Sequence, residues 1–250
     1  MTDFISPKDA DALRIAGLDS FDALWALELD AVDAPNTARG GWSSVYRLDV
    51  CGAGYYLKRQ SNYLSRSLRH PFGEPTFAAE LRNIRRYQHK QVPTLSPVFF
   101  AQRRVQGAVC AVLMTRALDG WQDLSCLLAQ WVSLGLVRQR GILSACGRLA
   151  RQLHAAHEAH GCFYPKHIFL RESLGGYEAC LIDLEKTRIL LGRRDRVRDL
   201  EALIRRVGFW NEDELRWLFA SYLDEGTGSR SIEVWLRHID ARHQHKVAQA

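Results

Sequence analysis

The sequence contains no segment that reads as a membrane span. The longest run without charged residues, 124–137, is shorter than the roughly 20 residues that a membrane-spanning helix needs. The N-terminus, Met1-Thr2-Asp3, also lacks the basic and apolar regions of a secretory signal. These absences predict a cytoplasmic protein.

Paired cysteines are absent as well. The six cysteines are scattered singly, with neither a C-x-x-C pair nor the spacing of a zinc site. They are Cys51, Cys110, Cys126, Cys146, Cys162 and Cys180. We therefore expect free, mostly buried thiols in a reducing compartment and no disulfide framework.

Nucleic-acid signatures are missing too, although the chain is basic. The net charge is +6 and the pI is near 9.1, with arginines concentrated at residues 82–86, 193–198 and 205–206. Such a surface favours polyanions, among them nucleic acid, anionic lipid headgroups and phosphorylated glycolipids. No zinc finger or RNP motif accompanies the arginines, so no nucleic-acid partner is expected. The simpler interpretation, arginine-rich solvated helix faces, stays open for many of them.

The order of elements predicts an α+β protein with two lobes. The 250 residues are 47% hydrophobic, enough to bury a core in one domain or in two joined lobes. Strand patterns lie between residues 45 and 114, and a mainly helical second half follows. We place a small β-rich N-terminal lobe at residues 1–115 and a mainly helical C-terminal lobe at residues 116–250.

A glycine turn in residues 39–45 opens the first pair of strands. Backbone amides of such a turn cradle phosphate groups, because the missing side chains allow close approach. The candidate nucleotide contacts here are Gly40, Gly41, Ser43 and Ser44. Most double-glycine turns serve only the chain reversal, so the turn alone does not predict a phosphate site.

Lys58 and Glu80 form the second part of the pattern. Lys58 ends the next strand, and Glu80 falls within the apolar face of a helix that starts near Thr76. A carboxylate there is costly unless it is paired, so we expect Lys58 to neutralise it and to bind nucleotide phosphate oxygens. In the alternative, Glu80 lies at the edge of the apolar stripe and reaches water. Met114, at the end of the last strand of the lobe, is the remaining candidate contact of the nucleotide.

The most specific pattern lies in residues 160–167, which read His-Gly-Cys-Phe-Tyr-Pro-Lys-His. In phosphotransferases of the protein-kinase type, a general base and a metal ligand share one short loop. A second metal-binding carboxylate ends the strand that returns from that loop. His167 and Asp183 fit the two metal ligands, and Cys162 stands at the position of the base. In the alternatives, Asp183 is a strand-terminating turn residue and His167 is a packed loop residue.

The helix before this loop has an apolar face that begins at Ile142 and continues to His157. It is predicted to end at His160-Gly161, where glycine suits a C-terminal stop. His154, His157 and His160 have the helical spacing of a metal site, but no carboxylate or cysteine completes the set. We therefore expect them to be surface and packing residues.

These residues resemble the bacterial lipopolysaccharide kinase family, which includes the heptose and Kdo kinases of the inner core and the InaA-like proteins. The resemblance spans residues 36–210 and is most specific in residues 160–170, then in Ile182-Asp183-Leu184 and in residues 196–200. It implies a two-lobed protein-kinase-like fold that binds ATP and Mg²⁺ at the cleft between the lobes. It also implies that Asp199 braces the catalytic loop from the helix below.

The resemblance assigns Lys58 to the nucleotide, Glu80 to that lysine, and His167 and Asp183 to the metal. The implied reaction transfers phosphate to a sugar hydroxyl of the lipopolysaccharide inner core, on heptose or Kdo, in outer-membrane lipopolysaccharide biosynthesis. The implied partners are the core glycolipid and the anionic membrane surface. The protein would be peripheral to the cytoplasmic face of the inner membrane.

Cys162 departs from the family pattern, in which an aspartate accepts the proton of the attacking hydroxyl. A thiol with an unperturbed pKa of about 8.5 is mostly neutral at pH 7. General-base catalysis contributes roughly 10²–10⁴ in rate, so its loss predicts a slow kinase. The alternative is a pseudokinase that binds nucleotide or partner proteins and regulates envelope synthesis or stress responses. A small-molecule kinase of the aminoglycoside or choline type is disfavoured, because such kinases normally keep the aspartate.

Overall fold

The computed structural model describes residues 3–38, 40–67 and 70–247. The chain forms two compact units, Met1–Arg86 with Leu95–Asp119 and Tyr87–Thr94 with Gly120–Ala250. We call them the β-rich unit and the helical unit. Among their described residues, no helix combines the length and the apolar character that crossing a bilayer requires.

The segment Tyr87–Thr94 departs from the predicted division at residue 115, because it belongs to the helical unit. Two contacts explain the difference. The Lys90 ammonium donates to the buried carboxylate of Glu158 at 2.6 Å, and the Leu181 amide donates to the Pro93 carbonyl at 3.0 Å.

A five-stranded antiparallel sheet forms the centre of the β-rich unit, in the order β1-β6-β7-β3-β2. Its strands are β1 (Phe4–Ile5), β2 (Trp42–Val50), β3 (Ala53–Ser61), β6 (Pro97–Val105) and β7 (Ala108–Arg116). Cys51 and Gly52 join β2 to β3 with φ of 50° and 78°, as a two-residue hairpin turn requires. β2 begins earlier than the predicted Val45, because the ladder with β3 continues back to Trp42.

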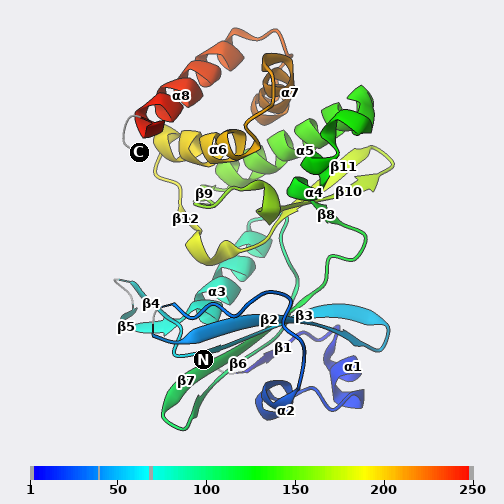
Figure 1. The fold of residues 1–250 in the computed structure, drawn as a ribbon, viewed down its shortest axis with the longest axis vertical. Helices are drawn as coiled ribbons and strands as arrows, with labels where there is room; N and C mark the ends of the chain where they lie inside the picture. The colour runs from blue at the N-terminus through cyan, green and yellow to red at the C-terminus, as the bar shows by residue number, and fades with distance from the viewer. Residues whose placement is uncertain (1–2, 39, 68–69, 248–250) are drawn as a thin grey trace. The chain divides into compact units, whose positions relative to one another are not determined.

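Helices cover both faces of this sheet (Figure 1). α1 (Ala10–Ile15) and α2 (Phe21–Ala26) lie on one face, where Leu13 and Phe21 pack with Leu57 of β3. α3 (Thr76–His89) lies on the other face and contributes Phe77 and Leu81 to a second cluster. A hairpin of β4 (Leu64–Ser67) and β5 (His70–Pro75) precedes α3. The two faces of β3 and β7 therefore meet different surroundings.

The helical unit is built around α5 (Gly135–Ala155), which packs on α7 (Glu212–Leu223). Gly147 permits this contact, since a Cβ there would collide with the Leu218 carbonyl. α6 (Arg193–Val207) packs on α8 (Arg230–Val247). The apolar face predicted for α5 is buried from Ile142 to Leu153.

The remaining elements of the helical unit are short. They are α4 (Leu124–Ala129), three 3₁₀ turns, η1 (Trp131–Leu134), η2 (Pro165–His167) and η3 (Leu184–Lys186), and five strands, β8 (Gln122–Asp123), β9 (Glu158–Ala159), β10 (Ile168–Ser173), β11 (Gly176–Leu181) and β12 (Arg188–Ile189). β10 and β11 form an antiparallel hairpin, and Asp183 follows its second strand after Ile182.

The prediction that the long helix runs to His160 was wrong. α5 ends at Ala155, and His157 adopts a left-handed conformation with φ of 57°. The physical reason is the next strand: β9 leaves the helical path to pair with β12. His160 therefore lies on the loop itself.

Candidate active site

Lys58 and Glu80 form a buried ion pair in the β-rich unit. The Lys58 Nζ lies 2.6 Å from the Glu80 Oε1, and the Glu80 side chain is only 5% exposed. Gln60 fixes the start of α3 by accepting the Phe77 amide at 3.0 Å, which sets Glu80 over β3. The predicted pairing is confirmed, and the alternative in which Glu80 reaches water is excluded.

The glycine turn closes a short antiparallel pair. Asn36 and Ser43 exchange two backbone hydrogen bonds of 2.9 Å, and Gly40 has φ of 75°. A Cβ at Gly41 would collide with the backbone carbonyl of Ser61, so packing within the unit already explains this glycine. Arg39, which begins the motif, lies outside the described residues. A phosphate contact by Gly40 and Gly41 stays a prediction.

The two serines of the motif belong to β2 and not to the turn. Ser43 pairs with Gln60, and Ser44 with Arg59. Ser44 is buried, and within the described chain its hydroxyl has no hydrogen-bond partner. Their contact with a nucleotide also stays a prediction.

Met114 faces away from Lys58, which corrects its expected place beside the nucleotide. In the sheet register Lys58 lies opposite Leu113, whereas Met114 lies opposite Leu57. Neighbouring residues of a strand point to opposite faces, so Met114 enters the core that α1 and α2 cover. Its neighbours on β7, Leu113 and Thr115, are on the Lys58 side.

The loop 160–167 of the helical unit is held by Asp199 of α6. Its carboxylate accepts the backbone amide of His160 at 2.7 Å and that of Gly161 at 3.0 Å. The imidazole of His160 is also buried, with its Nε2 3.0 Å from the Ile182 carbonyl. The brace expected from Asp199 is present, and His160 joins the loop to the residue before Asp183.

His167 and Asp183, the two candidate metal ligands, lie side by side. The Nε2 of His167 is 3.1 Å from the Asp183 Oδ2, and its Nδ1 is 2.9 Å from the Cys162 carbonyl. Asp183 holds this position with φ of 58°, a left-handed conformation that is uncommon for residues other than glycine. His167 is buried and its Nε2 faces a carboxylate, so its role as a metal ligand stays a prediction beside the packing alternative.

The neutral state of the His167 imidazole fits a bound cation. Burial lowers the pKa of His167 more than the nearby Asp183 carboxylate raises it, so the neutral imidazole is favoured. If Nδ1 donates to the Cys162 carbonyl, the lone pair of Nε2 points at the carboxylate of Asp183. Two acceptors at this distance repel each other unless a proton or a metal ion lies between them.

A metal at this pair would need other ligands. Within the described residues, no group of three or more histidine, cysteine, aspartate or glutamate side chains is arranged to hold a metal ion. Mg²⁺ is usually held by one or two carboxylates, with phosphate oxygens and water completing its shell. Asp183 therefore fits a magnesium ion that arrives with a nucleotide, whereas an imidazole is an unusual ligand for Mg²⁺, so metal binding by His167 stays a prediction.

Cys162 occupies the loop between these two histidines. It is a buried free cysteine, and its amide donates to the His160 Nδ1 at 3.3 Å. Its carbonyl accepts the Nδ1 of His167. The backbone of Cys162 thus orients both imidazoles whatever its side chain does.

Tyr164 and Arg206 are the residues at this loop that sequence reasoning missed. The guanidinium carbon of Arg206 lies 3.6 Å from the centre of the Tyr164 ring, and that ring lies 5.5 Å from the ring of His167. Arg206 also contributes to lowering the pKa of His167. No periodicity links the end of α6 to the loop, so only the fold reveals the contact.

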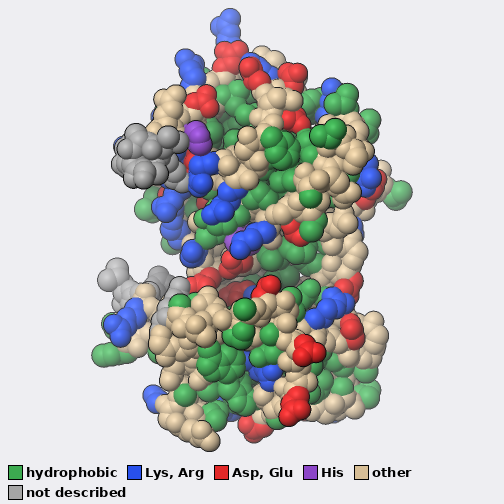
Figure 2. All heavy atoms as spheres, viewed as in Figure 1, with side chains coloured by type: hydrophobic (Ala, Val, Ile, Leu, Met, Phe, Trp, Pro, Cys, Tyr) green, Lys and Arg blue, Asp and Glu red, His purple; other side chains and the backbone are tan. Residues whose placement is uncertain are grey.

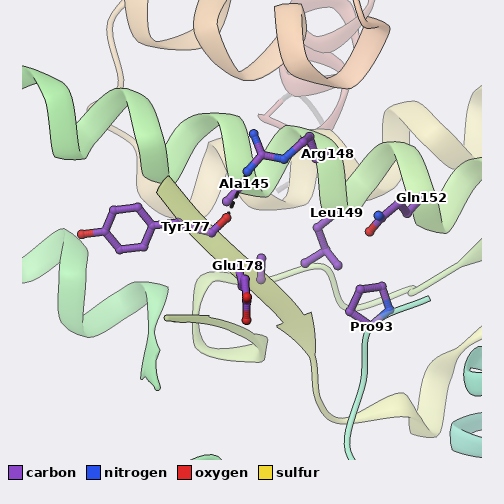
Figure 3. Close-up of a pocket in the computed structure, with 8 residues that line it drawn as sticks. Pro93, Ala145, Arg148, Leu149, Gln152, Tyr177 and Glu178 are labelled. Carbon is purple, nitrogen blue, oxygen red and sulfur yellow. Dashed lines mark hydrogen bonds between the residues drawn. The ribbon is translucent and has the colours of Figure 1, made fainter. Parts of the chain in front are cut away.

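A cavity of about 270 Å³ lies elsewhere in the helical unit, between α5 and β11 (Figure 3). Arg148 spans it and donates to the Tyr177 carbonyl at 3.0 Å, and Pro93 and Glu178 line it. None of the candidate site residues borders this cavity, so it is separate from the predicted chemistry.

Comparisons with known proteins agree with the fold and the motifs. The model of the lipopolysaccharide kinase (Kdo/WaaP) family matches residues 22–222. Protein InaA of Escherichia coli (strain K12) is 34% identical over 187 residues, which cover 72% of this chain and 84% of InaA. A solved structure of WaaP in complex with acyl carrier protein matches with a TM-score of 0.68 at 22% identity, over 98% of this chain and 99% of that one. The protein-kinase-like fold is thus confirmed.

Proposed function

Because the chain belongs to the lipopolysaccharide kinase (Kdo/WaaP) family, we propose that it transfers phosphate from ATP to a sugar hydroxyl of the lipopolysaccharide inner core, on heptose or Kdo. The observation that carries the proposal is the His167–Asp183 pair, in which His167 lies on the loop that Asp199 holds in place and Asp183 follows β11. Phosphoryl transfer depends mainly on positioning and on charge neutralisation, and a rigid pair of ligands supplies both.

Each candidate residue has one task in this reaction. Lys58, kept in place by Glu80, binds phosphate oxygens of ATP. His167 and Asp183 would hold Mg²⁺, which when bound would supply charge neutralisation at the triphosphate. The bond from the γ-phosphorus to the bridging oxygen breaks, the sugar oxygen bonds to phosphorus, the hydroxyl proton passes to solvent, and ADP leaves.

Cys162 sets the rate that the proposal predicts. A neutral thiol is a poor general base, and an effective general base contributes roughly 10²–10⁴ in rate. The natural protein is therefore a slow kinase with an intact metal pair. Its best acceptor is a hydroxyl that already loses its proton readily.

Transfer of radiolabelled phosphate from ATP to core oligosaccharide, with and without Mg²⁺, tests the proposal. Three variants go with the wild type: Cys162→Asp, Cys162→Ser and Asp183→Asn. We expect transfer by the wild type that depends on Mg²⁺, little change in Cys162→Ser, and loss of transfer in Asp183→Asn. Wild-type transfer no faster than the uncatalysed background, or an undiminished rate in Asp183→Asn, would contradict the proposed activity.

A pseudokinase is the second candidate, and Cys162 is the observation that favours it. As a pseudokinase, the protein would bind nucleotide or partner proteins and regulate envelope synthesis or stress responses. The Cys162→Asp variant separates the two readings. A large gain from a wild-type rate that equals the uncatalysed background identifies a binding protein that has lost its base. A gain from a measurable Mg²⁺-dependent wild-type rate identifies a slow kinase, and a neutral or harmful change shows a working site that uses cysteine.

We further propose that the helical unit binds the anionic surface of the inner membrane, where the acceptor glycolipid would be met. Lysine and arginine side chains gather around α6 and β12 on the face shown in Figure 2. The exposed arginines of α6 that we assign to this surface are Arg193 and Arg198. Exposed apolar side chains supply the second element, since Val132 is 93% and Phe209 52% exposed where both line one shallow depression. Basic and apolar groups together are typical of proteins that bind anionic bilayers.

Sedimentation with lipid vesicles tests this surface. We expect binding to vesicles with anionic lipids, little binding to neutral vesicles, and weaker binding of Val132→Ser/Phe209→Ser. An acyl carrier protein, the partner in the solved WaaP complex, is the alternative occupant. If it co-purifies and vesicles do not bind, the membrane assignment is wrong.

A further inference from the structure

We infer that Arg206 is a phosphate-binding residue of the candidate active site and that the ring of Tyr164 orients its guanidinium by stacking on it. The inference rests on the proposed function and adds a cation that neither the motifs nor the ion pair of the β-rich unit supplies.

The geometry ties Arg206 to the loop. Its guanidinium lies 3.6 Å from the centre of the Tyr164 ring, within the range of a close stacking contact. Tyr164 sits on the loop between Cys162 and His167, and its ring also contacts that of His167. Stacking on an aromatic face orders a long side chain that would otherwise move freely on the surface.

The neighbouring arginine shows what is distinctive about Arg206. Arg205 donates to the carboxylate of Glu201 at 2.8 Å and is thereby neutralised within the fold. No aspartate or glutamate among the described residues forms an ion pair with Arg206. Arg206 is also exposed, so its donors remain available to a ligand.

The charged groups at Arg206 and on the loop favour phosphate as the ligand. A guanidinium offers parallel donors that match phosphate oxygens, and such charge-assisted bonds are stronger than neutral ones. The same loop carries His167, a candidate ligand of the metal that accompanies phosphates. Lys166, exposed on the loop, adds a second cation and further favours an anion over a neutral sugar.

Two sources provide phosphate at this place: the terminal phosphate of the nucleotide and a phosphate already present on the core acceptor. Titration calorimetry distinguishes them with four probes, Mg·ATP, Mg·ADP, a phosphorylated core oligosaccharide and the same oligosaccharide after phosphatase treatment. The proteins are the full-length wild type, Arg206→Gln, Arg206→Lys, Tyr164→Phe and Tyr164→Leu. Arg194→Gln is the matched control, because Arg194 is an exposed arginine of the same helix.

We expect Arg206→Gln to weaken binding of one phosphate probe about tenfold, the size of a charge-assisted hydrogen bond. A loss confined to Mg·ATP assigns the nucleotide phosphate, and a loss confined to the phosphorylated oligosaccharide assigns the acceptor. Arg206→Lys should be intermediate, Tyr164→Phe should match the wild type, and Tyr164→Leu should resemble Arg206→Gln. Arg194→Gln should bind every probe normally.

Unchanged binding of all probes by Arg206→Gln, an equal loss in Arg194→Gln, or a wild type that binds no phosphate probe overturns the inference. Its failure is distinct from that of the proposed function. If Arg206→Gln transfers phosphate with unchanged kcat and KM, the inference about Arg206 is wrong and the proposed kinase activity stands. If binding of a phosphate probe depends on Arg206 but no phosphate is transferred, the inference about Arg206 stands and the proposed kinase activity is wrong.

Discussion

The carboxylate of Asp199 accepts the backbone amide of Gly161 at 3.0 Å, with its second oxygen engaged by the preceding residue of the loop. Asp199 is almost fully buried on α6. One helix thus fixes the point where the chain enters the candidate catalytic loop. The position of that loop depends on a buried charge and not on the loop's own packing alone.

Asp199→Asn should loosen this entry point. The amide nitrogen of asparagine cannot accept either backbone N–H group, so one buried donor loses its partner. We expect the free energy of unfolding to fall by about 2 kcal/mol, and Tm to fall by about 4–8 °C. Asp240→Asn, on the exposed side of α8, is the control and should unfold like the wild type. A thermal melt of Asp199→Asn that overlays the wild type would refute the bracing role.

The Lys58–Glu80 pair should show strong coupling between its members. Removing either partner leaves a buried charge, and that costs about 3–5 kcal/mol in fully buried pairs. We expect a smaller loss of about 2–3 kcal/mol here, because Lys58 retains some exposure. Urea unfolding of Lys58→Met, Glu80→Met and the double variant measures the coupling. The double variant should be more stable than the sum of the single losses predicts, and strict additivity would argue against the pair.

His160 should make the stability of the protein depend on pH. Its Nε2 faces a carbonyl and its Nδ1 accepts the Cys162 amide, so the fold requires the neutral ring. Burial accordingly lowers the pKa of His160 from its ordinary value of 6.5. The unfolded chain therefore takes up the proton first as pH falls. Stability from this group is complete above pH 6.5 and is lost as pH falls toward the folded pKa.

Urea unfolding between pH 5 and pH 8 measures this dependence. The slope from one such group is at most about 1.4 kcal/mol per pH unit. His160→Asn should be less stable at neutral pH but should show a flatter dependence below it. His89→Asn, which removes an exposed histidine, is the control and should keep the wild-type slope. An unchanged slope in His160→Asn would contradict the assignment.

Substitution of Met114 should leave the affinity for nucleotide unchanged. Its side chain packs in the core on the face opposite Lys58. Met114→Leu conserves volume, so we expect a stability change below about 1.5 kcal/mol and unchanged affinity for Mg·ATP. Thr115→Val, on the Lys58 side, provides the comparison. Tighter or weaker Mg·ATP binding in Met114→Leu would restore the original assignment.

The sequence correctly predicted the contacts of residues whose burial is costly without an interaction partner. Glu80 on an apolar stripe required a cation, and Lys58 was the nearest one in the expected order of elements. Met114 was misplaced because its face depends on strand register, which a run of apolar residues does not reveal. The end of α5 was missed because β9 pairs with a strand about thirty residues later, a long-range contact with no local signal. Arg206 was missed for the same reason.

The central claim is that Lys58 binds nucleotide phosphate and that Asp183 binds the accompanying Mg²⁺, and nucleotide titration of Lys58→Met and Asp183→Asn tests both parts most directly. We predict that Lys58→Met weakens nucleotide binding about tenfold or more with or without Mg²⁺. Asp183→Asn should instead remove the effect of Mg²⁺ on that affinity. Lys8→Met and Asp240→Asn, both exposed, are the charge-matched controls. Wild-type affinity and wild-type magnesium dependence in both site variants would contradict the account.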